Sequence, residues 1–197
     1  MLAYANRHRV DAEALVAVYC LAELLWRRGD LGEAAELLAA ARPLEAARPA
    51  ERGHRTVDLL LGLVALTRGD LVAAHDHLAV ALRSRVGYGF QSRAGEALNA
   101  FAVRCALAGE YATAAKLFGA AQAARTGPAP TTGLAGGYWF GWQAAVRAAI
   151  GDATFDLAYA EGNHLTLEEA AAVALAVEHP DLALGSLRFS DMDSRTS

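Results

Sequence analysis

The sequence predicts an all-helical fold made of stacked helical hairpins. The chain has 197 residues, 54% of them hydrophobic, and it is rich in alanine, the strongest helix former. β-Branched residues do not alternate with polar residues over any strand-length stretch. A glycine followed by an acidic residue recurs every 40 residues, at Gly29-Asp30, Gly69-Asp70 and Gly109-Glu110. Self-similarity at a fixed period predicts a stacked repeat, and such arrays usually bind partners rather than transform substrates.

The residues around these glycines repeat in register, which supports the same interpretation. A small residue precedes each glycine by seven positions, and an alanine, a large apolar residue and a second alanine follow it. The three sets are Ala22, Ala34, Leu38 and Ala41; Gly62, Ala74, Leu78 and Ala81; and Ala102, Ala114, Phe118 and Ala121.

The first hairpin is expected over residues 12–28 and 31–42. Apolar residues recur in its first helix at a spacing of three to four, which predicts one buried face. They are Leu15, Val18, Leu21 and Leu25. Gly29 is expected to end this helix in a left-handed conformation, and Asp30 to cap the next helix. Prolines and a glycine then break the chain over 43–53.

The remaining elements follow the same logic, and together they predict a single domain over residues 1–187. The further hairpins are expected over 55–68 and 71–85, over 91–108 and 111–124, and, in degenerate form, over 138–150 and 152–161. A flexible connection is expected at 125–137. Thr166 and Glu169 have the spacing of a capping box, which predicts a closing helix over 167–177. Residues 188–197 are expected to form a disordered tail.

The repeated pattern resembles the tetratricopeptide repeat, with about six residues of linker added to its usual period. The resemblance covers residues 12–124 well and 138–161 loosely. HEAT and armadillo units have a similar period but a different internal pattern. The resemblance implies a solenoid of about three and a half repeats, in which the first helix of each pair lines a concave surface.

The C-terminal third resembles a narrower group. The segments at 115–123, 151–155, 158–162 and 165–170 read AKLFGAAQA, GDATF, AYAEG and LTLEEA. They look like the end of the tetratricopeptide region of actinobacterial regulators with STAND-type ATPase modules, including LuxR-like and SARP-like transcriptional activators. In that family the repeats are taken to be a sensor or scaffold arm. The sequence carries no phosphate-binding P-loop motif and no helix-turn-helix with a basic recognition helix. Regulation is therefore implied by kinship alone, for an excised arm or a stand-alone descendant.

Charge and cysteine usage limit the classes of partner. The formal net charge is −4 and the basic residues are dispersed, so direct nucleic-acid binding is not expected. The uncharged stretch 126–146 contains prolines and glycines and is not expected to enter a membrane. Cys20 and Cys105 lack metal-ligand spacing and are expected to be buried thiols in a reducing compartment. No secretory leader is recognised, and the expected location is cytoplasmic.

The concave groove is the first candidate binding site. Its predicted lining is apolar in the middle and polar at the rims. The lining residues are Val16, Tyr19, Glu23, Trp26 and Arg27 from the first repeat, Thr56, Leu59, Leu63, Leu66 and Thr67 from the second, and Glu96, Asn99, Val103, Ala106 and Leu107 from the third. Arg27 and Asn99 alone are too few polar groups for a clamp on acidic peptide C-termini. An apolar helix, an apolar peptide or an apolar small molecule is expected to fit better.

The aromatic segment that opens the fourth pair is the second candidate. It carries four aromatic residues within five positions: Tyr138, Trp139, Phe140 and Trp142. Consecutive helical residues step by about 100°, so these side chains exceed what one buried stripe needs. They are interpreted as a plug for the end of the solenoid, as a partner surface or as part of a small-molecule pocket. The relatives usually carry a charged helix here, and Gly151-Asp152 arrives two residues late behind this segment.

No catalytic residue, metal site or cofactor is predicted. His75 and His77 point about 200° apart on a helix and cannot share a metal ion. His54 and Asp58 are four residues apart and are able to meet on one face. A histidine–carboxylate pair without a nucleophile or a pocket does not make an active site.

The sequence therefore predicts a binding module for protein–protein interaction or ligand sensing. The alternative is a protein that binds, or even converts, an apolar metabolite in the groove and at the aromatic segment. Self-association is a third option, through residues 1–28 or through the aromatic helix, because the first helix lacks an obvious polar cap.

Overall fold

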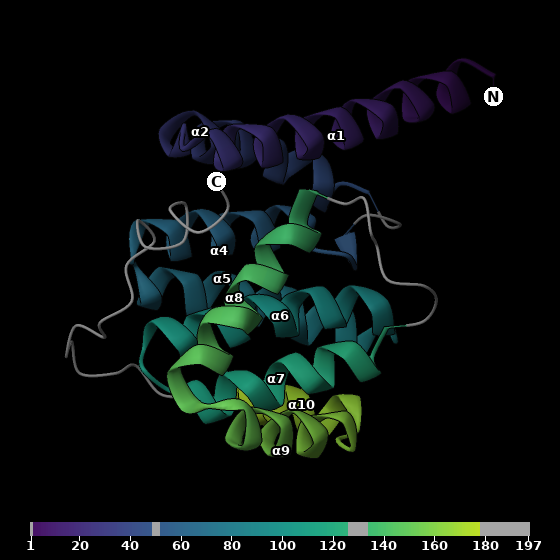
Figure 1. The fold of residues 1–197 in the computed structure, drawn as a ribbon. Coiled ribbons are helices and arrows are strands. Elements are labelled where there is room, and N and C mark those ends of the chain that lie inside the picture. The colour runs from purple at the N-terminus through teal and green to yellow at the C-terminus, as the bar shows by residue number, and fades with distance from the viewer. Residues whose placement is uncertain (1, 49–51, 126–133, 178–197) are drawn as a thin grey trace.

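The computed structural model describes residues 2–48, 52–125 and 134–177, and the side chains of residues 13–48, 52–125 and 137–177. All the regular elements in these ranges are helices, as the sequence predicts, and they form a tetratricopeptide-like array of hairpins with a terminal helix (Figure 1). The helices are α1 (Leu2–Arg28), α2 (Leu31–Ala46), α4 (Thr56–Arg68), α5 (Leu71–Gly87), α6 (Gln91–Leu107), α7 (Tyr111–Ala123), α8 (Leu134–Ile150), α9 (Asp152–Asn163) and α10 (Leu167–Ala176).

Three hairpins stack in chain order: α1–α2, α4–α5 and α6–α7. The second helix of one hairpin packs against the first helix of the next, α2 on α4 and α5 on α6. The first helices also contact one another, α1 with α4 and α4 with α6. We call the side formed by α1, α4 and α6 the first-helix face.

The turn inside each hairpin depends on its glycine. The three glycines have φ between 76° and 86°, a left-handed conformation that L side chains rarely adopt, which confirms the predicted turns. They are Gly29, Gly69 and Gly109. The cap predicted for Asp30 is wrong, because its side chain pairs with Nε of Arg28 at 3.1 Å and makes no cap hydrogen bond with α2. The equivalent Asp70 does cap α5, accepting a hydrogen bond from the backbone N–H of Ala73 at 2.9 Å.

Three helices are longer than the sequence predicts by four residues or more. α1 begins at Leu2 rather than at residue 12. α2 continues past Pro43 to Ala46, because buried Glu45 anchors its last turn. The Glu45 carboxylate accepts hydrogen bonds from the hydroxyl of Tyr19 at 2.9 Å and from the backbone N–H of Val57 at 3.0 Å. α8 begins at Leu134, inside the stretch predicted as a flexible connection. Residues 126–133 of that connection and the predicted tail lie outside the described residues.

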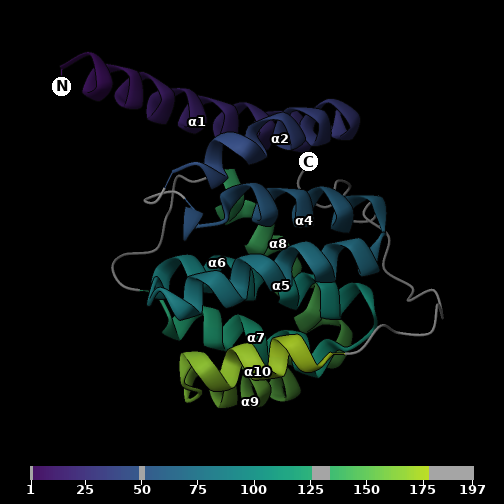
Figure 2. The same ribbon diagram turned by 180° about the vertical axis from the view of Figure 1, so that it is seen from behind.

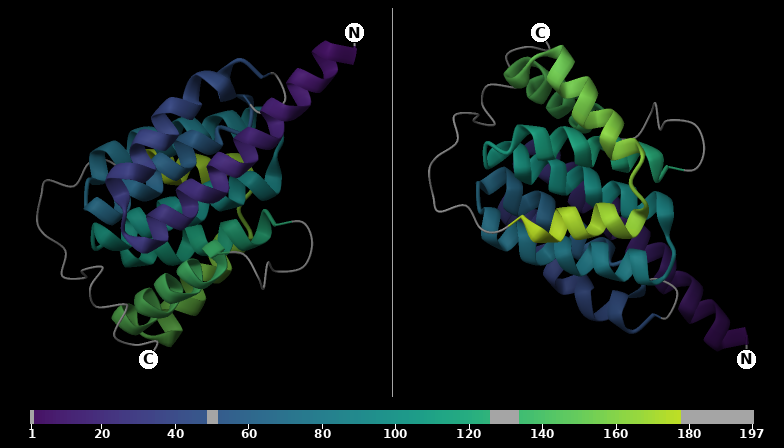
Figure 3. Two further views of the ribbon diagram at one scale, coloured as in Figure 1. Left: turned by 90° about the horizontal axis from the view of Figure 1, so that it is seen from above. Right: turned by 90° about the horizontal axis from the view of Figure 1, so that it is seen from below.

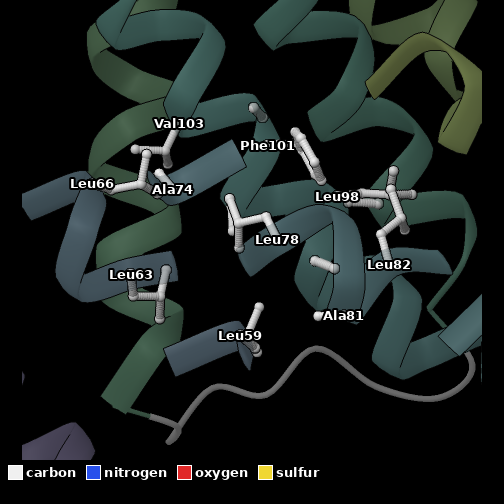
Figure 4. Close-up of a cluster of buried hydrophobic side chains, with 14 of the residues drawn as sticks. Leu59, Leu63, Leu66, Ala74, Leu78, Ala81, Leu82, Leu98, Phe101 and Val103 are labelled. Atoms are coloured by element: carbon white, nitrogen blue, oxygen red, sulfur yellow. The ribbon is translucent and has the colours of Figure 1, made fainter. Parts of the chain in front are cut away.

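The core lies between the stacked hairpins, where leucines interleave with small residues (Figure 4). A Cβ on Gly62 would lie 2.6 Å from Cδ2 of Leu78, so a larger residue here would displace the end of the Leu78 side chain. The buried face predicted for α1 is correct at Leu15 and Leu25. It is wrong at Leu21, which is 48% exposed, because no described element covers that side of α1.

The fourth pair departs from the regular stack. α9 packs along α7 at a crossing made by Gly119 and Gly162, where a Cβ on either glycine would collide with the backbone of the other helix. α10 starts with the predicted capping box of Thr166 and Glu169 and then folds back against α5, α6 and α7 (Figure 2). Arg104 of α6 is buried at this end of the array, where it donates hydrogen bonds to α5 and to the end of α10.

Candidate binding surface

α8 crosses the first-helix face instead of extending the stack. It contacts α6 and α7, and the ring of its Tyr138 lies edge-on to Trp26 of α1, with ring centroids 4.9 Å apart. Figures 1 and 2 show α8 on the side of the array opposite α5 and α10. Part of the predicted groove is therefore filled by the chain's own helix.

The aromatic side chains of α8 pack inward against the array. Tyr138 lies at the centre of the cluster, 4.9 Å from the ring of Trp139 and 6.4 Å from that of Trp142. Trp142 is only 1% exposed, and burial raises the pKa of Tyr138. Phe140 points outward and is 57% exposed. Three of the four aromatic residues therefore serve as a plug against the face, and Phe140 alone is on the surface.

Most of the predicted groove positions nearest the C-terminal ends of α1, α4 and α6 are buried. Trp26 donates a hydrogen bond from Nε1 to Oγ1 of Thr67 at 2.7 Å, which links the first hairpin to the second. The other buried positions are Leu63, Leu66, Val103 and Ala106. Figure 4 shows Leu63, Leu66 and Val103 on the side of the array where α8 passes. We call this area the covered half of the first-helix face.

Most of the remaining predicted groove positions are exposed or half-buried, but Leu59 is buried, and Glu23 occupies the repeat position of buried Leu63 and Val103. We call this area the open half, and its exposed or half-buried residues are Val16, Tyr19, Glu23, Thr56, Glu96 and Asn99. The hydroxyl of Tyr19 is held by Glu45, so the ring is fixed in place. Arg27, also predicted to line the groove, is exposed near the end of α1. The open half thus combines an apolar residue, an aromatic ring, an amide and two carboxylates.

The two carboxylates of the open half come from helices that are two hairpins apart. Burial raises the pKa of Glu23; the charge of Arg27 opposes this shift and the charge of Glu96 adds to it. Glu96 is already engaged, because it accepts from Nη1 of Arg85 at 3.3 Å and from Nη1 of Arg93 at 3.4 Å. A raised pKa means that the surroundings of Glu23 compensate its negative charge less well than water does.

Buried charged residues contact the open half from inside the array, and the sequence analysis did not predict them. Arg85 is fully buried and donates from Nε to the carbonyl oxygen of His54 at 2.7 Å and from Nη1 to that of Arg93 at 2.5 Å. Burial lowers its pKa to about 10. The sequence does contain a signal for this position, since Glu45 of α2, Arg85 of α5 and Arg125, two residues after α7, are charged and recur at the 40-residue period. A charge repeated at a fixed position of an array predicts a structural contact between neighbouring repeats.

The histidines belong to structural contacts. Asp58 is buried and accepts from Nη2 of Arg42 at 2.7 Å, with Nδ1 of His77 at 3.6 Å. His54 stacks on Phe90 with ring centroids 4.3 Å apart, so the pairing of His54 with Asp58 that the spacing allows is replaced by these contacts. Among the described residues no group of three or more potential metal-ligating side chains is present.

The two cysteines differ. Cys105 is buried as predicted, and burial raises its pKa to about 12. The prediction for Cys20 is wrong, because this thiol is exposed on the same uncovered side of α1 as Leu21.

A shallow surface hollow of about 320 Å³ lies away from the aromatic cluster, between the α6–α7 turn and the end of α8, with Gly109, Tyr111 and Ile150 in its wall. The helices of the described ranges include none that is both long and apolar enough to cross a bilayer.

The chain matches no protein-family model, no curated protein and no solved structure. Its resemblance to the tetratricopeptide arm of bacterial regulators therefore rests on the sequence motifs.

Proposed function

We propose that this chain is a tetratricopeptide-like binding module that acts in protein–protein interaction, with the open half of the first-helix face as its docking surface. The observation that carries the proposal is the division of this face. α8 fills the covered half with its own aromatic side chains, and the open half keeps Val16, Tyr19, Glu23 and Asn99 accessible or half-buried.

The side chains of the open half indicate which kind of partner would bind there. Glu23 is a half-buried carboxylate whose charge is under-compensated, and a lysine or arginine side chain would lower its pKa again. Tyr19 is a rigid aromatic side chain of the kind that is enriched at interaction hot spots. Asn99 offers both a donor and an acceptor to a peptide backbone. The expected partner is therefore an extended or helical peptide segment with one basic side chain between apolar ones.

The regulatory role implied by the motifs at 115–170 is part of the proposal. An arm of this kind would hold a partner segment while a separate ATPase or DNA-binding domain acts, at the cytoplasmic location expected from the sequence. The alternative of an apolar metabolite at the aromatic cluster has less support, because Tyr138, Trp139 and Trp142 are packed against one another and against the array.

The test is a peptide-display selection against the full chain, followed by fluorescence anisotropy with the selected peptides. We expect enrichment of peptides with a lysine or arginine flanked by apolar residues. Glu23→Lys should weaken their binding about tenfold or more, since tenfold corresponds to about 1.4 kcal/mol, which lies between the values for losing an exposed and a buried charge pair.

The matched control is Glu36→Lys, which makes the same change of charge at an exposed position of α2. It should leave the affinity within about twofold, because an exposed charge outside the interface contributes little. Equal loss in both variants would indicate a general effect of charge, and full binding by Glu23→Lys would place the partner elsewhere; either result contradicts the proposal.

A further inference from the structure

The side of α1 that faces away from the array is apolar and uncovered. Leu21 is 48% exposed and Leu24 is 47% exposed, and Ala17 and Cys20 are exposed beside them. These residues recur at a spacing of three to four, so they form one stripe along the helix. We call this stripe the outer face of α1.

Most of the same positions are buried in the next two repeats, and Leu61, the equivalent of Leu21, is half-buried. The residues 40 and 80 positions after Ala17 are Val57 and Ala97, and both are buried. The equivalents of Leu24 are Val64 and Arg104, which are also buried. The outer face of α1 therefore has the composition and position of a surface that, elsewhere in this array, is covered by a helix.

The internal repeats show how the covering helix runs. On α6 it is α5, and three contacts fix its direction. Near the start of α6 the Arg93 carbonyl meets Arg85, in the middle Phe101 meets the ring of His75 at 5.8 Å, and near its end Arg104 donates to the Leu71 carbonyl at 3.0 Å. Contacts move toward the start of α5 as they move toward the end of α6. The covering helix is antiparallel to the helix that it covers.

A second copy of α1 satisfies this requirement, because a two-fold axis perpendicular to a helix makes the helix antiparallel to its copy. An axis between Cys20 and Leu21 would set Leu24 against Ala17 of the second copy, and Arg28 against Glu13 of the second copy. Arg28 is exposed even though it pairs with Asp30, so its guanidinium is accessible to a further carboxylate. Among the described side chains of α1, Glu13 and Glu23 are acidic and Arg27 and Arg28 are basic, and the pairing of Arg28 with Glu13 would occur twice across the axis.

The length of α1 agrees with this arrangement. α1 has 27 residues, whereas α4 has 13 and α6 has 17, and its N-terminal part extends past the rest of the molecule (Figures 1 and 3). A helical segment without tertiary contacts is marginal in water. In the antiparallel pair, this part of each α1 would run alongside the first hairpin of the other copy.

We propose that two copies of this chain associate through the outer faces of α1, antiparallel to each other, about a two-fold axis near Cys20 and Leu21.

The first test is sedimentation of the full chain at micromolar concentration. The wild type is expected to have twice the mass of the chain. The double variant Leu21→Glu/Leu24→Glu should have the mass of one chain, because it places carboxylates in the contact. The control is Leu157→Glu, which changes a leucine of α9 that is 66% exposed and lies far from α1. It should remain a dimer, and circular dichroism should show unchanged helix content in both variants.

The second test uses Cys20, which would lie near its copy at the axis. Diamide accepts two electrons and two protons from two thiols, so it should join the two copies through a disulfide between their Cys20 residues. Cys20→Ser should abolish the cross-link, and Cys105→Ser should not, because Cys105 is buried.

A wild-type chain that sediments as a monomer would overturn the proposal. The outer face of α1 would then be covered by a helix of another protein or of another part of a longer chain. A dimer that survives the double variant would overturn the choice of surface. A dimer that the double variant disrupts but that gives no Cys20 cross-link would overturn the antiparallel arrangement.

Discussion

At the scale of single residues, buried arginines connect repeats by donating to backbone carbonyl oxygens. Arg104 donates from Nε to Leu71 at the start of α5 and from Nη1 to Val177 at the end of α10, at 3.0 and 3.3 Å. Burial lowers the pKa of Arg104, so its charge is held in the interior at a cost. A cation at the C-terminus of α10 also interacts favourably with the helix dipole.

Arg104→Ala is expected to lower the free energy of unfolding by about 3 kcal/mol, because it leaves buried carbonyl oxygens without a donor and opens a cavity. Urea denaturation followed by circular dichroism measures this change. The matched control is Arg68→Ala. Arg68 donates at 2.9 Å to Leu31, which is the equivalent of Leu71 in the first hairpin, but its side chain is exposed. That variant should lose about 0.5 kcal/mol, and equal losses in the two variants would refute the role of burial.

Glu23 gives the open half a defined pH dependence. Its pKa in the folded state is raised, so the folded chain holds this proton more tightly than the unfolded chain does. The stability that this proton contributes is present below the ordinary pKa of a glutamate and is lost as the pH rises through the raised value.

Glu23→Gln should therefore be more stable than the wild type at about pH 7 and equal to it at about pH 4, where Glu23 is protonated and resembles glutamine. Paired urea titrations at the two pH values measure the difference. A difference of the same size at both values would show that the substitution acts through packing and not through the charge.

At the scale of helices, the contact of α7 with α9 depends on two glycines. A Cβ on Gly119 would collide with the carbonyl oxygen of Tyr159, and a Cβ on Gly162 with that of Lys116. Backbone cannot yield as a flexible side chain can, so α9 would have to move as a whole.

Gly119→Ala is expected to destabilise the chain by about 2–3 kcal/mol, although alanine is the better helix former. Gly32→Ala makes the same change in α2, where a Cβ would meet nothing within 4 Å. It should be neutral or stabilise the chain by up to about 1 kcal/mol. The midpoints of urea denaturation of the two variants should thus move in opposite directions, and a rise for Gly119→Ala would contradict the close contact.

The helices themselves were largely predictable from sequence. The ends at Arg28, Arg68 and Leu107 fall within a residue of the expected positions, because a glycine in a left-handed conformation is a strong local signal. The wrong boundaries lie where tertiary contacts override local signals. α2 passes a proline because Glu45 is anchored by a residue of another helix, and α8 includes two glycines ahead of its packed aromatic residues.

At the scale of the whole molecule, the sequence predicted the array but not the path of α8. The 40-residue period fixes which residues of α1, α4 and α6 share a face, and the structure confirms that Leu63 and Val103 lie on it together. The period contains no information on a helix that leaves the stack. For this reason the sequence analysis treated the whole face as open, whereas Trp26 and Leu63 are buried and Tyr19 and Asn99 are half-buried.

The crossing of α8 has a consequence for how the chain unfolds. In an ordinary repeat array each unit contacts only its neighbours, so terminal units can fray one at a time. Here Trp26 of the first hairpin touches Tyr138 of the fourth, and α10 spans two hairpins from the other side. Loss of either terminal unit removes contacts from the far end of the array, which couples the repeats into one cooperative transition. All three tryptophans of the chain, Trp26, Trp139 and Trp142, lie where α8 packs on the first-helix face. Their fluorescence emission therefore reports the unfolding of the whole array.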